Sequence, residues 1–75
     1  MQRYANLSGK SGVKAFALGA GHIDVQFEDD AVYRYTHSST GKDEVEEMKR
    51  LAVAGRGLTS FINRNVRGNY ATRLK

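Results

Sequence analysis

The stretch His22–Phe27 reads His-Ile-Asp-Val-Gln-Phe and decides the fold, because hydrophobic and polar residues alternate along it. Strand geometry sends successive side chains to opposite faces, so Ile23, Val25 and Phe27 share one side and the polar residues share the other. This pattern predicts a strand with one buried and one solvent-facing side.

The hydrophobic segment 13–18 is predicted to be the partner of this strand. A two-residue turn at 20–21 would join the two segments as a hairpin. In that register Phe16 lies opposite Val25, and both side chains reach the same buried face.

A third strand is predicted at 32–37. If the turn before it contains the three residues 29–31, Tyr33 lies beside Phe27 and the ring of Tyr35 shares the same face. A two-residue turn would send both rings to the other face. We favour the longer turn because it keeps the larger apolar area on one side of the sheet.

The hydrophobic period lengthens after residue 40, which indicates helices. Thr40 and Asp43 form a capping-box pattern, acidic residues dominate the following turns, and Gly55 is typical of a helix end. These signals predict a helix over about 41–54. Hydrophobic residues at helical spacing predict a second helix over about 58–67.

Strands followed by helices predict an α+β domain, with a small antiparallel β meander over about 13–37 and the helices on one face or end. At 75 residues the chain holds one domain, since a typical domain needs about 100–150. Residues 1–12 are expected to form a flexible arm or a short strand. The tail over 69–75 could add a short edge strand.

Charge is divided unevenly along the chain. Residues 1–47 carry five basic and eight acidic side chains, whereas residues 48–75 carry seven basic and none acidic. Such separation favours a face that binds a polyanion, because Lys and Arg displace the counterions condensed on phosphates. The alternative is a solvated basic surface without a ligand.

The candidate binding residues combine guanidinium, amide and phenol groups. Arginine forks offer several donors to phosphate oxygens, and a tyrosine ring can stack on an unpaired base. Asn63 could also serve only to bond the preceding loop, and Tyr33 and Tyr35 could belong to the core. The candidate nucleic-acid-binding residues are Arg34, Arg56, Asn63, Arg64, Arg67, Tyr70 and Arg73.

Several classes of protein are disfavoured by composition. The chain has no cysteine and only two distant histidines, so we expect no structural metal and no cofactor. No apolar run approaches the ~18 residues of a membrane span, and the first residues lack the hydrophobic region of a secretion signal. We therefore expect a cytoplasmic protein without a membrane partner.

An enzyme is the weakest candidate. His22, Asp24 and Ser38 could be imagined as a catalytic set, but strand alternation places the first two on the solvent face, where such pairs are commonly inert. We therefore expect no catalytic residues.

Several segments follow one another in order: 13–18, 23–27, Val-Tyr-Arg-Tyr at 32–35, Gly57, and Phe-Ile-Asn-Arg-Asn-Val-Arg at 61–67, ending near Tyr70. This combination resembles the KTSC domain. This family is found at the C terminus of some lysyl-tRNA synthetases and as stand-alone bacterial proteins. The resemblance covers residues 11–70 and implies one KTSC-like domain over 11–75. It also implies an Sm-like or SH3-like open barrel with helical additions, an uncharacterised function, and RNA or tRNA as partner.

One departure from the family bears on the sheet. The family usually has glycine where Asp30 and Ala31 stand here, so an Asp must take the positive φ of the turn or the turn must differ.

Together these observations predict a non-catalytic module that binds RNA or single-stranded nucleic acid through a basic C-terminal helix face. The alternative is a protein-interaction or self-assembly module, in which an exposed sheet edge at 13–18 or 32–37 pairs with another chain or with a second copy.

Overall fold

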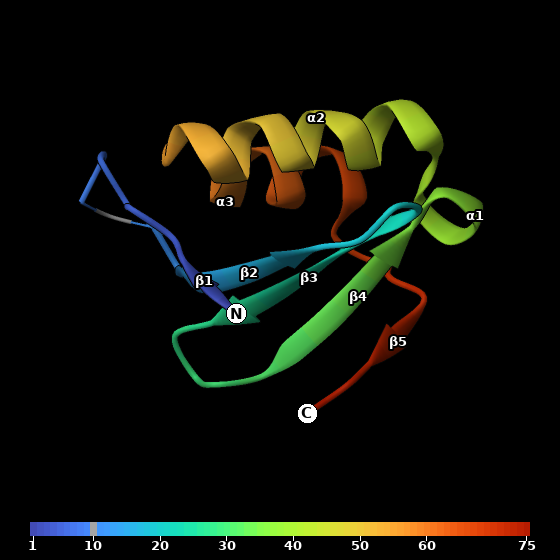
Figure 1. Cartoon of the computed structure of the whole chain (residues 1–75), viewed down its shortest axis with the longest axis horizontal. Coiled ribbons are helices and arrows are strands. Elements are labelled where there is room, and N and C mark those ends of the chain that lie inside the picture. The colour runs from blue at the N-terminus through green and yellow to red at the C-terminus, as the bar shows by residue number, and fades with distance from the viewer. Residues whose placement is uncertain (10) are drawn as a thin grey trace.

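The computed structural model describes residues 1–9 and 11–75 and has two layers, a sheet and a set of helices on one of its faces (Figure 1). All neighbouring strands are antiparallel and follow chain order. The predicted α+β class and the β meander are therefore confirmed. The strands are β1 Gln2–Arg3, β2 Val13–Leu18, β3 His22–Phe27, β4 Val32–Thr36 and β5 Thr72–Arg73.

The β2–β3 hairpin has the predicted register. Phe16 lies opposite Val25, and the backbone N–H of Gly19 donates to the carbonyl of His22 at 2.9 Å across the two-residue turn. The ammonium of Lys49 donates to the carbonyl of Gly19 at 2.7 Å and thereby fastens this turn to the helical layer.

The register between β3 and β4 differs from the prediction by two residues. Tyr33 lies opposite Val25 instead of beside Phe27, because the N–H of Phe27 donates to the carbonyl of Ala31 and the three-residue loop starts at residue 28 instead of 29. Asp30 takes the positive φ of this loop, at +70°. A shift of two positions preserves the face of every side chain, so both tyrosines still face the helices.

The first long helix starts differently from the prediction. Helix α2 spans Lys42–Ala54, close to the predicted 41–54, but Gly41 caps it without a side-chain hydrogen bond. Thr40 is therefore not the cap, and the predicted capping box with Asp43 is wrong. The hydroxyl of Thr40 instead donates to the carbonyl of Asn69 at 2.6 Å.

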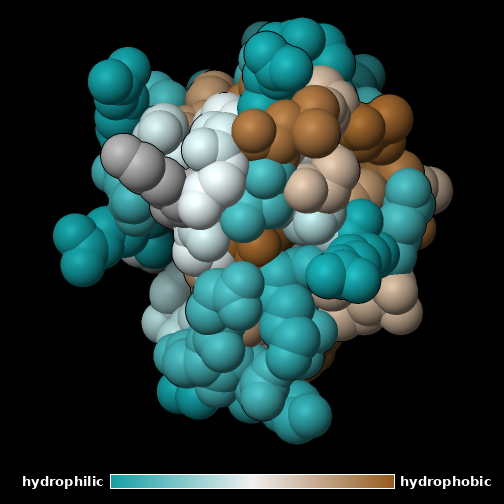
Figure 2. Space-filling model, turned by 90° about the vertical axis from the view of Figure 1, so that its left-hand side faces the viewer, coloured by the Kyte–Doolittle hydropathy of each residue, from teal (hydrophilic) through white to brown (hydrophobic). Residues whose placement is uncertain are grey.

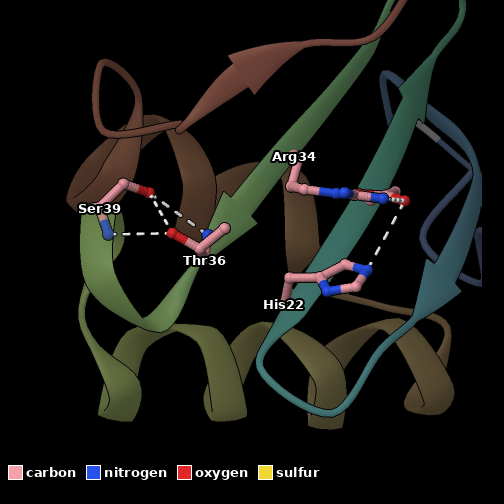
Figure 3. Close-up of polar contacts among 5 residues, drawn as sticks. His22, Arg34, Thr36 and Ser39 are labelled. Carbon is pink, nitrogen blue, oxygen red and sulfur yellow. Dashed lines mark hydrogen bonds and ion pairs between the residues drawn. The ribbon is translucent and has the colours of Figure 1, made fainter.

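An unpredicted single turn, α1 (His37–Thr40), separates β4 from α2. Thr36 and Ser39 form a reciprocal capping box in which the Thr36 hydroxyl accepts from the Ser39 N–H at 3.0 Å (Figure 3). This box ends the strand at Thr36, one residue before the predicted end, because it turns the backbone into the helical region.

The second helix has the predicted extent but changes type midway. Helix α3 spans Leu58–Phe61, and the π-helix η1 continues it over Ile62–Val66. Gly55 ends α2 in the left-handed region as predicted, with φ at +81°. A π-helix is wider than an α-helix and often marks a functional position.

The core lies between the sheet and the helices. Its largest fully buried side chains come from both layers and are Tyr35, Phe16, Ile23, Met48, Leu58, Val13, Val25, Val45 and Val66. Tyr4 also belongs to it, at 3% exposure, and its hydroxyl accepts from the backbone N–H of Leu58. The segment expected as an arm or short strand thus contributes a strand and a core aromatic residue.

Short strands cover both sheet edges that were expected to be exposed. β1 pairs with Ala15 and Phe16 of β2, and β5 pairs with Tyr33 and Arg34 of β4. The edge strand predicted in the tail is thereby confirmed. Among the described residues, no helix has the length and hydrophobicity needed to cross a membrane.

Candidate nucleic-acid interface

A cleft of about 230 Å³ opens between β4 and η1. Aromatic rings make up much of its wall, and three of the predicted binding residues, Asn63, Arg67 and Tyr70, line it. The lining residues are Phe27, Tyr33, Tyr35, Ile62, Asn63, Arg67 and Tyr70.

The rings of the cleft contact one another at steep angles. The centroids of Tyr33 and Tyr70 are 4.6 Å apart with their planes at 55°, and those of Tyr35 and Tyr70 are 6.4 Å apart in an edge-to-face arrangement. Phe27 meets Tyr33 edge-on at 5.8 Å. Tyr35 is only 2% exposed, whereas Tyr70 is 41% exposed, so the cleft has a buried floor and an accessible wall.

Tyr35 belongs to the core and Tyr33 lies between core and cleft. Burial raises the pKa of the Tyr35 phenol to about 12, and the nearby rings of Tyr33 and Tyr70 act in the same direction. Tyr35 therefore remains a neutral phenol at physiological pH. Both tyrosines line the cleft, Tyr33 half-buried and Tyr35 almost fully buried.

Two hydrogen bonds hold the segment that carries Tyr70. On one side, the Thr40 hydroxyl donates to the carbonyl of Asn69 at 2.6 Å; on the other, the N–H of Ala71 donates to the carbonyl of Arg34 at 2.7 Å. The backbone on both sides of Tyr70 is thus held, to α1 through Asn69 and to β4 through Ala71. Sequence reasoning assigned Thr40 to a helix cap and missed this role, because the contact spans 29 residues.

Asn63 and Arg67 follow the buried Ile62 and Val66 on η1 and are exposed along the cleft. Among the described residues, neither side chain forms a hydrogen bond or an ion pair, so both have free donors. The alternative role of Asn63, bonding the preceding loop, is not seen in the described part. Arg64 is exposed on the same helical segment.

Arg73 does not line the cleft but lies beside one of its residues, Tyr33, to which it is paired across β4 and β5. Its guanidinium carbon lies 5.7 Å from the centroid of the Tyr33 ring, and its Nε donates to the carbonyl of Lys75 at 2.9 Å. The other guanidinium nitrogens of Arg73 are oriented by these two contacts but are not occupied by an acidic side chain in the described residues.

Arg34 lies apart from this group, on the outer face of the sheet. Its Nε and Nη2 donate to the two carboxylate oxygens of Asp24 at 2.8 and 3.0 Å (Figure 3). The prediction placed Arg34 on the face opposite the two tyrosines, and it lies there, but its charge is balanced within the fold. Arg56 lies in the loop between α2 and α3, before the helical segment that leads to Tyr70.

Acidic partners are found on cations outside this region. Among the described residues, four Lys or Arg side chains pair with carboxylates, namely Lys14 with Asp30, Arg34 with Asp24, Lys49 with Glu46 and Arg50 with Glu47. In the described part of the chain, Arg56, Arg64, Arg67 and Arg73 have no such partner. Uncompensated positive charge is thus concentrated in the C-terminal third.

The imagined catalytic set does not assemble. Arg34 occupies both oxygens of Asp24, and His22 Nε2 is 3.9 Å from Asp24 Oδ2, too far for a hydrogen bond (Figure 3). Asp24 lies on the outer face of the sheet, as strand alternation predicted, but Arg34 pairs with it there and it is only 8% exposed. In the described ranges, no hydrogen bond joins Ser38 to either residue.

The other histidine, His37, forms a hydrogen bond with Glu46, with its Nε2 2.8 Å from Glu46 Oε2. This contact, together with that of Lys49, lowers the pKa of the Glu46 carboxyl. Residues 1–9 and 11–75 contain no group of three or more His, Asp or Glu side chains arranged to hold a metal ion.

Comparison with known proteins gives no match: no family model fits the chain, and no curated protein or solved structure is similar to it. The resemblance to the KTSC domain therefore stays a prediction drawn from the residues of 33–35 and 57–67. What the site can do has to be argued from its geometry and charge.

Proposed function

We propose that this chain is a non-catalytic module that binds RNA or single-stranded nucleic acid through the surface formed by η1, the Tyr70 segment and β5. In this proposal the protein is cytoplasmic, and its twisted sheet is a curled, Sm-like or SH3-like open barrel with helical additions.

One observation carries the proposal: the arginines around the aromatic cleft lack acidic partners, whereas four cations elsewhere have them. No acidic side chain lines the cleft. Arg67, the residue after η1, lines the cleft, and Arg73 lies beside Tyr33, so positive charge adjoins rings on which a base can stack. Nucleic acids present this pair of features, phosphates next to flat bases.

A solvated basic surface accounts less well for the arrangement. Exposed arginines need no ligand, but nothing in solvation requires them to flank an open aromatic cleft. Large aromatic surface next to Arg is instead typical of binding sites, because ring and guanidinium both lose little conformational entropy on contact.

The proposal is tested by fluorescence anisotropy with a labelled single-stranded RNA and with tRNA over a range of salt concentrations. Binding should weaken steeply with salt, because phosphate contacts release counterions. The double variant Arg64→Ala/Arg67→Ala should bind more weakly and lower the slope of log K against log salt by about 1 to 1.5, if each arginine meets one phosphate.

A matched control removes the same charge from elsewhere. Lys14→Ala/Arg50→Ala deletes two exposed cations that are paired with Asp30 and Glu47. This variant should keep most of the affinity. If both double variants weaken binding equally, net charge alone explains it, and if wild-type protein binds neither RNA at low salt, the proposal is wrong.

The alternative function, a protein-interaction or self-assembly module, draws on a different surface. Figure 2 faces the end of the molecule where α2 terminates, and hydrophobic side chains gather in its upper part between hydrophilic ones. Leu7 and Val53 are 60% and 64% exposed, and the N–H of Leu7 bonds the carbonyl of Gly55 at the end of α2. Exposed apolar groups of this kind can mark an interface.

Light scattering at high protein concentration tests self-assembly. If Leu7 and Val53 join two copies, wild-type protein should have the mass of a dimer, and Leu7→Ser/Val53→Ser should have the mass of a monomer. A wild-type monomer at all concentrations would rule out this homo-oligomer.

A further inference from the structure

We infer that the cleft between β4 and η1 is a pocket for one unpaired nucleobase, which stacks against the tyrosine wall while Asn63 contacts its polar edge and Arg67 contacts the adjoining phosphate. The inference rests on the proposed function and adds to it the chemical group that enters the cleft.

The dimensions of the cleft suit a single flat ring system. Its volume of about 230 Å³ is below the roughly 300–1,000 Å³ of pockets that enclose drug-sized ligands. Tyr70 is 41% exposed, the Tyr33 ring centroid lies 4.6 Å from that of Tyr70, and Ile62 lines the helical side. A planar aromatic guest gains stacking and apolar burial there at once.

The polar groups at the rim match the rest of a nucleotide. The Asn63 amide carries both a donor and an acceptor, as base edges do, and the described residues supply no hydrogen-bond partner for it. Arg67 lies four residues further along the chain, directly after η1, and lines the same cleft. The amide can therefore meet the base edge while the guanidinium meets a phosphate oxygen.

Charge distinguishes a nucleobase from the other guest that aromatic pockets commonly take. Rings arranged as a cage also bind quaternary ammonium groups, such as methylated lysine, through cation–π attraction. Here Arg67 lines the cleft, Arg73 lies 5.7 Å from the Tyr33 centroid, and no carboxylate is present in the lining. A cationic guest would be repelled, whereas a guest next to phosphate is attracted.

The backbone that carries Tyr70 is also held in place before any ligand arrives. Both chain neighbours of Tyr70 are held by hydrogen bonds, to Thr40 on one side and to Arg34 on the other. A segment whose backbone is already held loses less freedom when a base stacks on its side chain, so more of the contact energy appears as affinity.

A base reaches such a cleft only when it is out of a helical stack. In a duplex the faces of the bases are covered by their neighbours, so only single strands, loops or ends can insert one. The inference therefore predicts a preference for unpaired strands over duplexes of equal charge.

The test compares two RNA eight-mers that have the same number of phosphates, one with ordinary bases and one in which every nucleotide is abasic. Anisotropy should show roughly 10- to 100-fold weaker binding of the abasic strand, because stacking on the pocket is lost while phosphate contacts remain. In NMR spectra, the ring protons of Tyr33 and Tyr70 should shift with the ordinary strand and not with the abasic strand.

Variants of the wall separate stacking from folding. Tyr70→Leu should remove most of the difference between the two strands, while Tyr70→Phe, which keeps a flat ring, should preserve it. Asn63→Ala should weaken the ordinary strand several-fold and leave the abasic strand unchanged. Circular dichroism shows whether each variant is folded.

The outcomes are distinguishable from those of the proposed function. Equal affinity for both strands would overturn the base pocket and leave phosphate binding in place. Absence of binding to either strand would overturn both proposals. Binding of a trimethyl-lysine peptide with the tyrosine shifts, without such shifts from RNA, would identify an ammonium cage and overturn the base pocket.

Discussion

The two faces of β4 differ in whether their cationic side chains have acidic partners. On the outer face, Arg34 donates to both oxygens of Asp24, so its charge is consumed within the sheet. On the inner face, Tyr33 and Tyr35 contribute rings, and the cation beside Tyr33, Arg73, has no acidic side chain as partner in the described residues. The outer face of β4 therefore has a paired cation, and the inner face adjoins a cation that has no acidic partner among the described residues.

An excess of Arg on a small domain therefore does not by itself identify a binding surface. Four of its cations are balanced by carboxylates in the fold. What identifies a candidate interface is charge without a partner beside apolar rings that solvent can reach, and this combination occurs around η1.

The largest effect is expected from the floor of the cleft. Replacing Tyr35 by Ala should reduce the free energy of unfolding by about 3–5 kcal/mol, because a large buried ring leaves a cavity. The change should be measured by urea unfolding. A domain of this size has only about 4–11 kcal/mol in total, so the variant should be marginally folded.

Tyr35→Phe serves as the control, since it retains the volume and should cost less than about 1.5 kcal/mol. A small loss for Tyr35→Ala would show that Tyr35 is not part of the core and that the inner face is more open than its 2% exposure indicates.

A smaller effect is expected from the tether of Tyr70. Thr40→Val should lower the free energy of unfolding by about 1–2 kcal/mol, because the carbonyl of Asn69 loses its donor in a partly buried place. RNA affinity should fall several-fold with an unchanged salt slope, since no phosphate contact is lost. Thr40→Ser, which keeps the hydroxyl, should restore both properties.

If Thr40→Val lowered stability but left the affinity for RNA unchanged, Thr40 would be structural only. Measuring unfolding and anisotropy on the same protein samples separates these two roles.

Local patterns were sufficient for much of the fold. Alternation along His22–Phe27 predicted a strand, the short turn after β2 predicted the Phe16–Val25 pair, and Gly55 predicted the end of α2. Each of these signals depends on residues that are close in sequence, so periodicity and turn chemistry can reveal them.

The remaining features depend on contacts between distant segments. The β3–β4 register followed from which residue took the positive φ, and a pattern of consecutive Asp residues could not settle that. Thr40 does not act as the predicted helix cap, and its hydroxyl bonds the carbonyl of the distant Asn69. The cleft needs β4 and η1 to meet, so only its polar side, Asn63 and Arg67, was predictable from helical spacing.

The pH dependence of stability should also report on the inner face. The Tyr35 pKa rises from its ordinary value of 10.0 to about 12 in the folded chain. Below pH 10 the phenol is neutral in both the folded and the unfolded chain, and its full contribution to the free energy of unfolding is present. As the pH rises from there toward 12, the unfolded chain loses the proton first, so the free energy of unfolding decreases.

The loss should be of order 1 kcal/mol, because solvent in the neighbouring cleft moderates the penalty on the charged form. Urea unfolding between about pH 9 and pH 12 should show a steeper decline for wild type than for Tyr35→Phe, which lacks the titrating group. Parallel declines would contradict the assignment. Other groups titrate in the same range, so only the difference between the two proteins is informative.

The smallest effect is expected on the outer face, and it is the sharpest test of the contrast between the two faces. Asp24→Ala releases the Arg34 guanidinium and adds one unit of net positive charge, yet Arg34 remains on the side of the sheet away from the cleft. Affinity for RNA should therefore rise by less than about two-fold, the effect of a distant charge screened at physiological salt. Arg34→Ala should likewise leave affinity almost unchanged, whereas Arg67→Ala, which removes the same charge from the cleft, should weaken binding clearly. A strong gain from Asp24→Ala would mean that RNA crosses β4 and uses both faces, and the division described above would not hold.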